Sequence, residues 1–190
     1  MLMEALSTGA DVGGLDVPDI GPVFFAALGL HVAAGVTCLV SGALAATAHK
    51  QAGRHPRAGA VYLYGIGVVF VTASVMAIIR WEQDAHLFAI AAGTFSVAML
   101  GWWVRRKRPR RWLALHGAAM AGSYIALLTG FYVDNGPQLP LWNQLPDLAF
   151  WLLPAAIGIP LTLRALIHNG AISRRRPSAA RIADQRRPRR

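Results

Sequence analysis

The chain alternates between long apolar blocks and short polar links. Five blocks occupy approximately residues 22–48, 58–80, 84–104, 111–133 and 148–168. As a helix, an apolar stretch of about 20 residues spans the ~30 Å hydrocarbon core of a bilayer. The pattern therefore predicts an all-α integral membrane bundle with five transmembrane helices. No internal repeat accompanies it.

The links differ in charge, and this difference predicts an orientation. Except for Arg80, every lysine and arginine lies near one of three segments: the link after the first block, the link after the third, and the C-terminus. Of the nine acidic residues, only Asp184 lies there. Because positive charge stays on the cytoplasmic side, we expect the N-terminus outside and the C-terminus inside. The organisation is then a polar outer tail at 1–21, the bundle at 22–170 and a basic disordered inner tail at 171–190.

Composition narrows the class of protein. Of 190 residues, 55% are hydrophobic and only 15% are charged, which is too apolar for an ordinary soluble domain. A single cysteine, Cys38, excludes a disulfide framework and a cysteine-based zinc site within the chain. Phosphate-binding loops, dinucleotide fingerprints, nucleophile elbows and HExxH motifs are missing from the sequence. We therefore do not expect a hydrolase or kinase of a soluble type.

The two tails carry opposite charge. The N-terminal tail has no lysine or arginine before its apolar residues, so we expect it to be retained rather than cleaved as a signal peptide. The C-terminal tail, 173–190, is basic, and we expect it to lie on anionic lipid headgroups of the inner surface. The alternative is an arm that binds protein or nucleic acid. Since no aromatic residue or motif accompanies the charges, we do not expect a nucleic-acid partner.

The histidines are the side chains with ligand chemistry, and they form two groups. Two are predicted near the outer side and four near the inner side: His31 and His86, then His49, His55, His116 and His168. Membrane cytochromes of type b hold haem iron between imidazoles of two helices in this way. The predicted haem ligands are His31, His86, His55 and His116. His31 lies about 9 Å deeper than His86, which weakens the outer pair. For His49, His55 and His168 the alternative is a purely interfacial position.

A polar stripe follows one face of the fourth block. His116, Met120, Ser123 and Tyr124 are offset by 0, 4, 7 and 8 residues, which places them on one side of a helix. Polar residues inside a membrane mark a functional site unless they face protein. The alternative is that Ser123 and Tyr124 hydrogen-bond to backbone and neighbouring helices while Met120 fills space.

Two short patterns carry a resemblance to a known family. One is His-x-x-x-Gly-x-x-Tyr, from His55 to Tyr62, and the other is His-x-x-x-Met-x-x-Ser-Tyr, from His116 to Tyr124. Together with His31, they resemble the bacterial membrane proteins grouped as domain of unknown function 2306, over residues 23–135. The resemblance implies a bacterial inner-membrane location and joins His31, His55 and His116 in one site. It also favours His55 over His49 as the partner of His116, and it implies no activity.

Three functions compete at this point. The first is a redox protein that holds one or two haem b groups and exchanges electrons with a partner protein. The second is a proton-coupled transporter of a small molecule that uses His31 and His116. The third is a non-catalytic subunit or lipid-binding scaffold, alone or as a homo-oligomer, in which the stripe sets helix packing. In each, His49 and Tyr62 line the same interior as Met120, Ser123 and Tyr124.

Overall fold

Five long helices make up the computed structural model, which describes residues 10–12, 15–17, 21–48, 53–140 and 142–172. They are α1 (Gly21–Thr47), α2 (Arg54–Ile79), α3 (Trp81–Lys107), α4 (Trp112–Asn135) and α5 (Asp147–His168). All five are long and apolar enough to cross a membrane. The predicted all-α bundle of five spans is confirmed. His49 and the tail at 173–190 lie outside the described residues.

The N-terminal segment holds a small element that the sequence did not lead us to expect. Strands β1 (Ala10–Val12) and β2 (Leu15–Val17) pair antiparallel, with Ala10 opposite Val17. Apolar and acidic residues alternate in this segment around a Gly-Gly step, a sequence signal for a two-residue hairpin turn. The predicted polar tail thus contains a hairpin, outside the helical bundle.

The links between helices are shorter than predicted. Arg80 alone separates α2 from α3, because α3 begins at Trp81 and not near residue 84. Glu82 and Asp84 fall in the first turn of α3, where acidic side chains favour the positive end of the helix dipole. Beyond α4, the chain forms the 3-10 turns η1 (Gly136–Gln138) and η2 (Trp142–Gln144).

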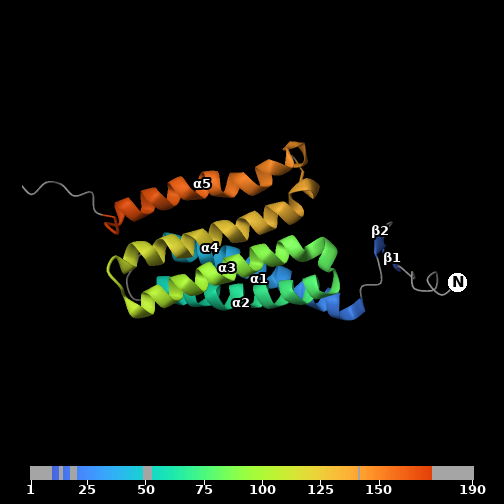
Figure 1. Ribbon diagram of the computed structural model, residues 1–190, viewed down its shortest axis with the longest axis horizontal. Helices are drawn as coiled ribbons and strands as arrows, with labels where there is room; N and C mark the ends of the chain where they lie inside the picture. Colours follow the sequence, from blue (N-terminus) through green and yellow to red (C-terminus); the bar gives the residue numbers. More distant parts are fainter. Residues whose placement is uncertain (1–9, 13–14, 18–20, 49–52, 141, 173–190) are drawn as a thin grey trace, which may run out of the picture.

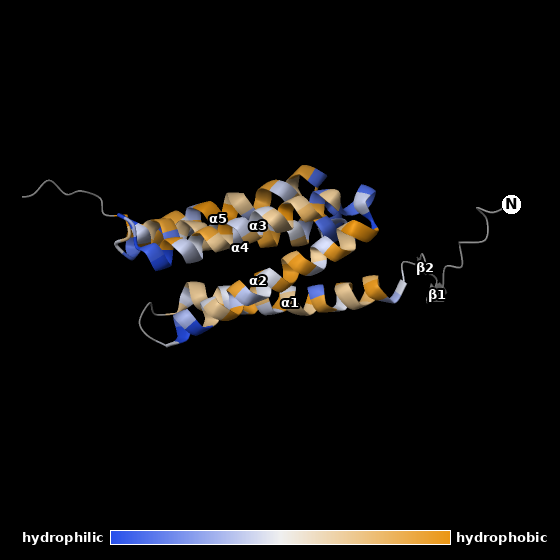
Figure 2. Ribbon diagram, turned by 60° about the horizontal axis from the view of Figure 1, so that its bottom comes forward, coloured by the Kyte–Doolittle hydropathy of each residue, from blue (hydrophilic) through white to orange (hydrophobic). Residues whose placement is uncertain are grey.

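The helices pack in chain order as two hairpins with an added helix. α1 packs on α2 and α3 packs on α4, while α2 contacts α3 and α1 approaches α4. These four helices form an antiparallel bundle, and α5 lies along the outside of α4 (Figure 1). When the bundle is turned, the α1–α2 hairpin lies on one side and α3, α4 and α5 lie on the other, with α2 in contact with α3 (Figure 2). Residues that connect the two units therefore decide whether the bundle holds together.

The interior contains many small side chains around a few large ones such as Tyr62. A central cluster of buried residues lies between the hairpins: Ala34, Cys38, Tyr62, Ile66, Val69 and Ala98. Small residues let helices approach closely in a membrane, where lipid tails give no hydrophobic force for association. Large apolar side chains such as Val32, Val40 and Leu44 are exposed on the outer surface instead. This distribution is the one expected for a bundle surrounded by hydrocarbon.

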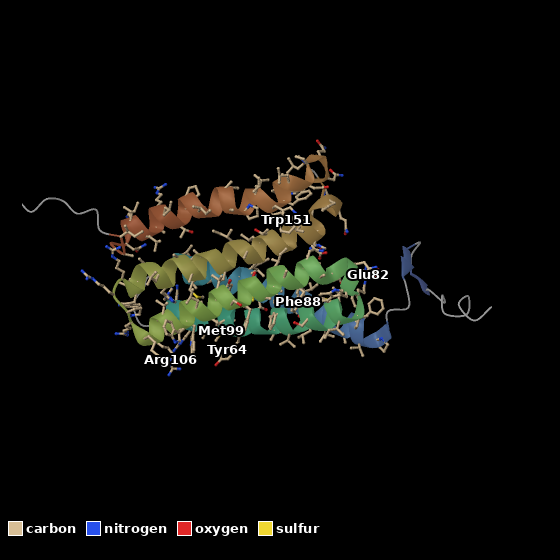
Figure 3. The ribbon with its side chains drawn as sticks, viewed as in Figure 1. Tyr64, Glu82, Phe88, Met99, Arg106 and Trp151 are labelled. Atoms are coloured by element: carbon tan, nitrogen blue, oxygen red, sulfur yellow. The ribbon has the colours of Figure 1, made fainter. Side chains whose placement is uncertain are left out.

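Charge is segregated between the two ends of the bundle. The basic link between α3 and α4 lies at one end, and the acidic first turn of α3 lies at the other, as Arg106 and Glu82 show in Figure 3. This agrees with the charge pattern of the sequence. Which end faces the cytoplasm stays a prediction.

We expect Gly42→Ala to destabilise the bundle strongly. A Cβ atom at Gly42 would lie 2.5 Å from the Tyr124 ring, and that ring is held in place by a hydrogen bond of its hydroxyl to α1. Forced repacking of a tight site costs roughly 1–3 kcal/mol. The measurement is thermal unfolding in detergent. Gly29→Ala is the matched control, because a Cβ there meets nothing within 4 Å; equal stabilities for the two variants would show that the contact is not tight.

Candidate functional site

The middle of the bundle contains a buried hydrogen bond between α2 and α4. The Tyr62 hydroxyl lies 3.0 Å from Ser123 Oγ, and both side chains are at most 2% exposed. Ser123 Oγ lies 2.9 Å from the carbonyl of Met120, to which it donates. Because a serine hydroxyl has one hydrogen, Tyr62 donates to Ser123. The predicted site residues Tyr62 and Ser123 are thus partners.

The second tyrosine of the stripe reaches a different helix. The Tyr124 hydroxyl donates to the Leu39 carbonyl of α1 at 3.0 Å. Its ring lies beside Gly42 and 6.1 Å from the Tyr62 ring, between centroids. We call Tyr62, Ser123 and Tyr124 the tyrosine cluster. It connects α4 of one hairpin to α1 and α2 of the other.

The first half of the stripe faces α3. His116 Nδ1 lies 2.9 Å from the Gly101 carbonyl, and the Met120 side chain lies against the Cα of Gly101. A carbonyl only accepts, so the Nδ1 of His116 carries the hydrogen. The stripe predicted from the sequence therefore divides into two contacts. His116 and Met120 join α4 to α3, and Ser123 and Tyr124 join it to the α1–α2 hairpin.

His55 joins the ends of α1 and α2. Its Nδ1 lies 2.8 Å from the carbonyl of Ala45, in the last turn of α1. Carbonyls in the last turn of a helix have no partner within the helix. His55, one residue into α2, therefore supplies the C-terminal cap of α1.

His31 lies in the half of the α1–α2 hairpin that is farther from His55. Its Nδ1 lies 2.9 Å from Thr72 Oγ1, which itself donates to the carbonyl of Val68 at 2.8 Å. His31 must then donate to Thr72. Because His31 and Ala45 are 14 residues apart, the imidazoles of His31 and His55 are separated by about 21 Å along α1. They do not share one site, contrary to what the family resemblance implies.

The acidic end of the bundle gathers charges from three helices. The Asp134 carboxylate of α4 interacts electrostatically with the imidazoles of His31 and His86 and with the carboxylate of Asp84. The side chains of His86, Asp134 and Glu82, which lies in the first turn of α3, are exposed. The sequence placed His31 and His86 on this side, but it gave no sign that Asp134 connects them.

The predicted haem ligands are distributed over separate contacts. His55 bonds to α1, His116 bonds to α3 and His31 bonds to α2, whereas His86 is exposed. Among the described residues, no group of three or more histidine, cysteine, aspartate or glutamate side chains could hold a metal ion. The role of the four histidines as ligands stays a prediction.

The sequence identified most of the polar residues of the interior, but it did not identify their hydrogen-bond partners. Thr72, the acceptor for His31, lies in an apolar block, and its spacing matched no motif. The carbonyls of Leu39, Ala45 and Gly101 carry no signal in a sequence. Gly42 could have been found, because it lies on the small-residue face of α1 that permits close approach.

Comparison with known proteins adds no relative. No family model, curated protein or solved structure matches this chain. The five apolar helices make it a polytopic membrane protein.

We expect His55→Ala to fray the last turn of α1. The change removes the donor that satisfies the Ala45 carbonyl, at a cost of about 1 kcal/mol. Hydrogen exchange should rise at the amides that end α1 and stay unchanged in the middle of that helix. His168→Ala, an exposed histidine in the last turn of α5, is the control. Unchanged exchange in the His55 variant would mean that the imidazole does not act as a cap.

Proposed function

We propose that this protein is a non-catalytic component of a membrane, whose interior polar side chains fix the arrangement of its own helices. One observation carries the proposal: the interior tyrosines and histidines form hydrogen bonds between helices of the same chain. Tyr62, Tyr124 and His116 each reach a different neighbouring helix. Among the described residues, no buried side-chain nitrogen or oxygen is without a partner.

The energies involved suit this role. An interhelical hydrogen bond in a membrane contributes only about 0.6 kcal/mol on average. An unsatisfied polar group in hydrocarbon costs several kcal/mol, so wrong arrangements of the helices are disfavoured far more than the right one is favoured. A few such bonds therefore specify how the two hairpins dock. A rigid bundle of this kind is suited to act as a subunit or scaffold for another membrane component, including a second copy.

We further propose the inner membrane of a bacterium as the location, with the basic end of the bundle in the cytoplasm. Arg106 stacks over the Trp102 ring at 5.0 Å and Arg108 over the Trp112 ring at 5.2 Å. Tryptophan prefers the membrane interface, and basic residues there attract anionic headgroups. Membership of the family of unknown function resembled by the motifs stays a prediction.

Haem b binding is the second candidate, and the tautomers of the histidines favour it. When Nδ1–H donates to a carbonyl, as in His55 and His116, the lone pair lies on Nε2, the usual ligand atom. The two imidazoles would hold a haem at one end of the bundle, and His31 and His86 would hold one at the other. A bound haem would supply one-electron chemistry with a redox partner.

A reduced-minus-oxidised spectrum separates the two candidates. We expect protein purified from haem-supplied cells to show no haem bands, and His116→Ala to lower its unfolding temperature through loss of the bond to Gly101. Haem bands in the wild type that His116→Ala or His55→Ala removes would overturn the structural proposal in favour of the redox one. His168→Ala, on the exposed end of α5, controls for general damage.

A further inference from the structure

A strongly basic surface lies where α3 turns into α4. We call residues 105–111, the end of α3 and the turn before α4, the basic link. Six of its seven residues are basic, and all six are exposed. The acidic residues of the five helices lie at the other end of the bundle: Glu82, Asp84, Asp134 and Asp147. No carboxylate of these helices therefore neutralises the basic link, and its charge is available to an anion from outside the chain.

Two arginines of the basic link are held in place by tryptophan rings. The guanidinium carbon of Arg106 lies 5.0 Å from the centre of the Trp102 ring, and that of Arg108 lies 5.2 Å from the centre of the Trp112 ring. Stacking uses the flat face of a guanidinium, so the N–H groups at its edge stay free. Within the part of the chain that the structure describes, the ring contacts are the only interactions of these two guanidinium groups. Each is thus a positioned cation with unused hydrogen-bond donors.

The backbone of the basic link places the two arginines on adjacent helices. Arg108 has a left-handed φ of 47° and ends α3, and Arg111 has a φ of 66° and precedes α4. The turn between them is closed by the Trp112 amide, which donates to the Pro109 carbonyl at 2.9 Å. The Arg108 side chain reaches over this turn to the first residue of α4, whereas Arg106 stacks on α3 itself. A short, hydrogen-bonded turn therefore fixes where the two cations lie.

The stacking of Arg106 sets the depth at which its charge lies. Trp102 precedes Arg106 by about one turn, which is about 6 Å farther toward the hydrocarbon. An arginine at the end of a membrane helix usually extends its charged group toward water. The guanidinium of Arg106 is instead folded back along the side of α3 (Figure 3). Because tryptophan rings lie at the level of the lipid headgroups, this cation is held where lipid phosphates lie.

We propose that the basic link binds the phosphate of an anionic phospholipid, of the phosphatidylglycerol type, through the guanidinium groups of Arg106 and Arg108. A guanidinium donates two parallel N–H bonds to phosphate oxygens. A headgroup without an ammonium group leaves the charge of its phosphate for the protein to compensate. The proposal rests on the interfacial position proposed above for this end of the bundle, and not on the proposed structural role.

An acidic segment of a soluble protein is the competing occupant, because it would also complement the charge of the basic link. Depth decides between them. A soluble segment meets side chains that extend into water, whereas Arg106 is turned back toward the hydrocarbon and lies against an aromatic ring. A phospholipid brings its phosphate to that depth and is therefore the better complement.

Charge-matched substitutions test the phosphate site. Arg106→Gln and Lys107→Gln each remove one charge from neighbouring exposed residues in the last turn of α3, and of the two only Arg106 stacks on a tryptophan. Native mass spectrometry of the full chain in detergent, mixed with equal amounts of phosphatidylglycerol and phosphatidylcholine of the same chain length, counts the bound lipids. We expect the wild type to prefer phosphatidylglycerol. Arg106→Gln should lower the affinity for it about tenfold, and Lys107→Gln at most about twofold.

Replacing the ring tests the positioning of Arg106 without a change of charge. Trp102→Leu should lower the affinity for phosphatidylglycerol about fivefold, because the guanidinium loses its platform. Trp103→Leu is the matched control, since it alters the neighbouring exposed tryptophan, on which neither Arg106 nor Arg108 stacks. The affinity of the Trp103 variant should be unchanged.

The proposal fails if Arg106→Gln and Lys107→Gln lower the affinity equally, since a diffuse attraction between charges has that result. It also fails if Trp102→Leu binds lipid like Trp103→Leu, or if the wild type prefers phosphatidylcholine. Displacement of the lipid by inorganic phosphate or by polyglutamate, beyond the effect of sodium chloride at the same ionic strength, would assign the basic link to a free anion or an acidic protein. Lipid binding in detergent depends neither on orientation nor on haem, so each of these failures leaves the proposed structural role and location standing.

Discussion

Polar groups surrounded by hydrocarbon must find partners inside the protein, and the tyrosine cluster is where this bundle meets that constraint. Tyr62 donates to Ser123 across the interface of the two hairpins, and Tyr124 donates back to the α1 backbone at Leu39. Both bonds depend on Gly42, since a larger residue there would occupy the space of the Tyr124 ring. The docking of the hairpins thus depends on the three hydroxyl groups of the tyrosine cluster and on the absence of a side chain at Gly42.

The remaining contacts are of two kinds: hydrogen bonds of histidines within each hairpin, and close packing of α5 on α4. His55 and His31 act within the first hairpin, and His116 acts within the second. α5 packs on α4 at two glycines, where Leu166 fits over Gly117 and Ile125 fits over Gly158. Polar bonds specify which helices meet in the four-helix core, whereas close packing over glycine attaches the fifth helix. The acidic end of the bundle, around Asp84 and Asp134, lies outside this scheme.

The helices could be predicted from the sequence because hydrocarbon thickness and helix periodicity constrain residues that are close together along the chain. The five spans and the shared face of His116, Met120, Ser123 and Tyr124 required only these two rules. The partners could not be predicted, because a period of 3.6 residues gives a face but not the neighbour that the face meets. His116 and Tyr124 share a face and yet bond to α3 and α1. Most of the missed acceptors are backbone carbonyls, which every residue possesses.

The most direct test of this account is a double-mutant cycle on Tyr62→Phe and Ser123→Ala, with the free energy of unfolding measured in detergent. If the hydroxyl pair joins the hairpins, the two changes together should cost less than the sum of the single changes, with a coupling of about 0.6 kcal/mol or more. Additive effects, with no coupling beyond error, would contradict the claim that buried polar contacts between the hairpins organise the bundle.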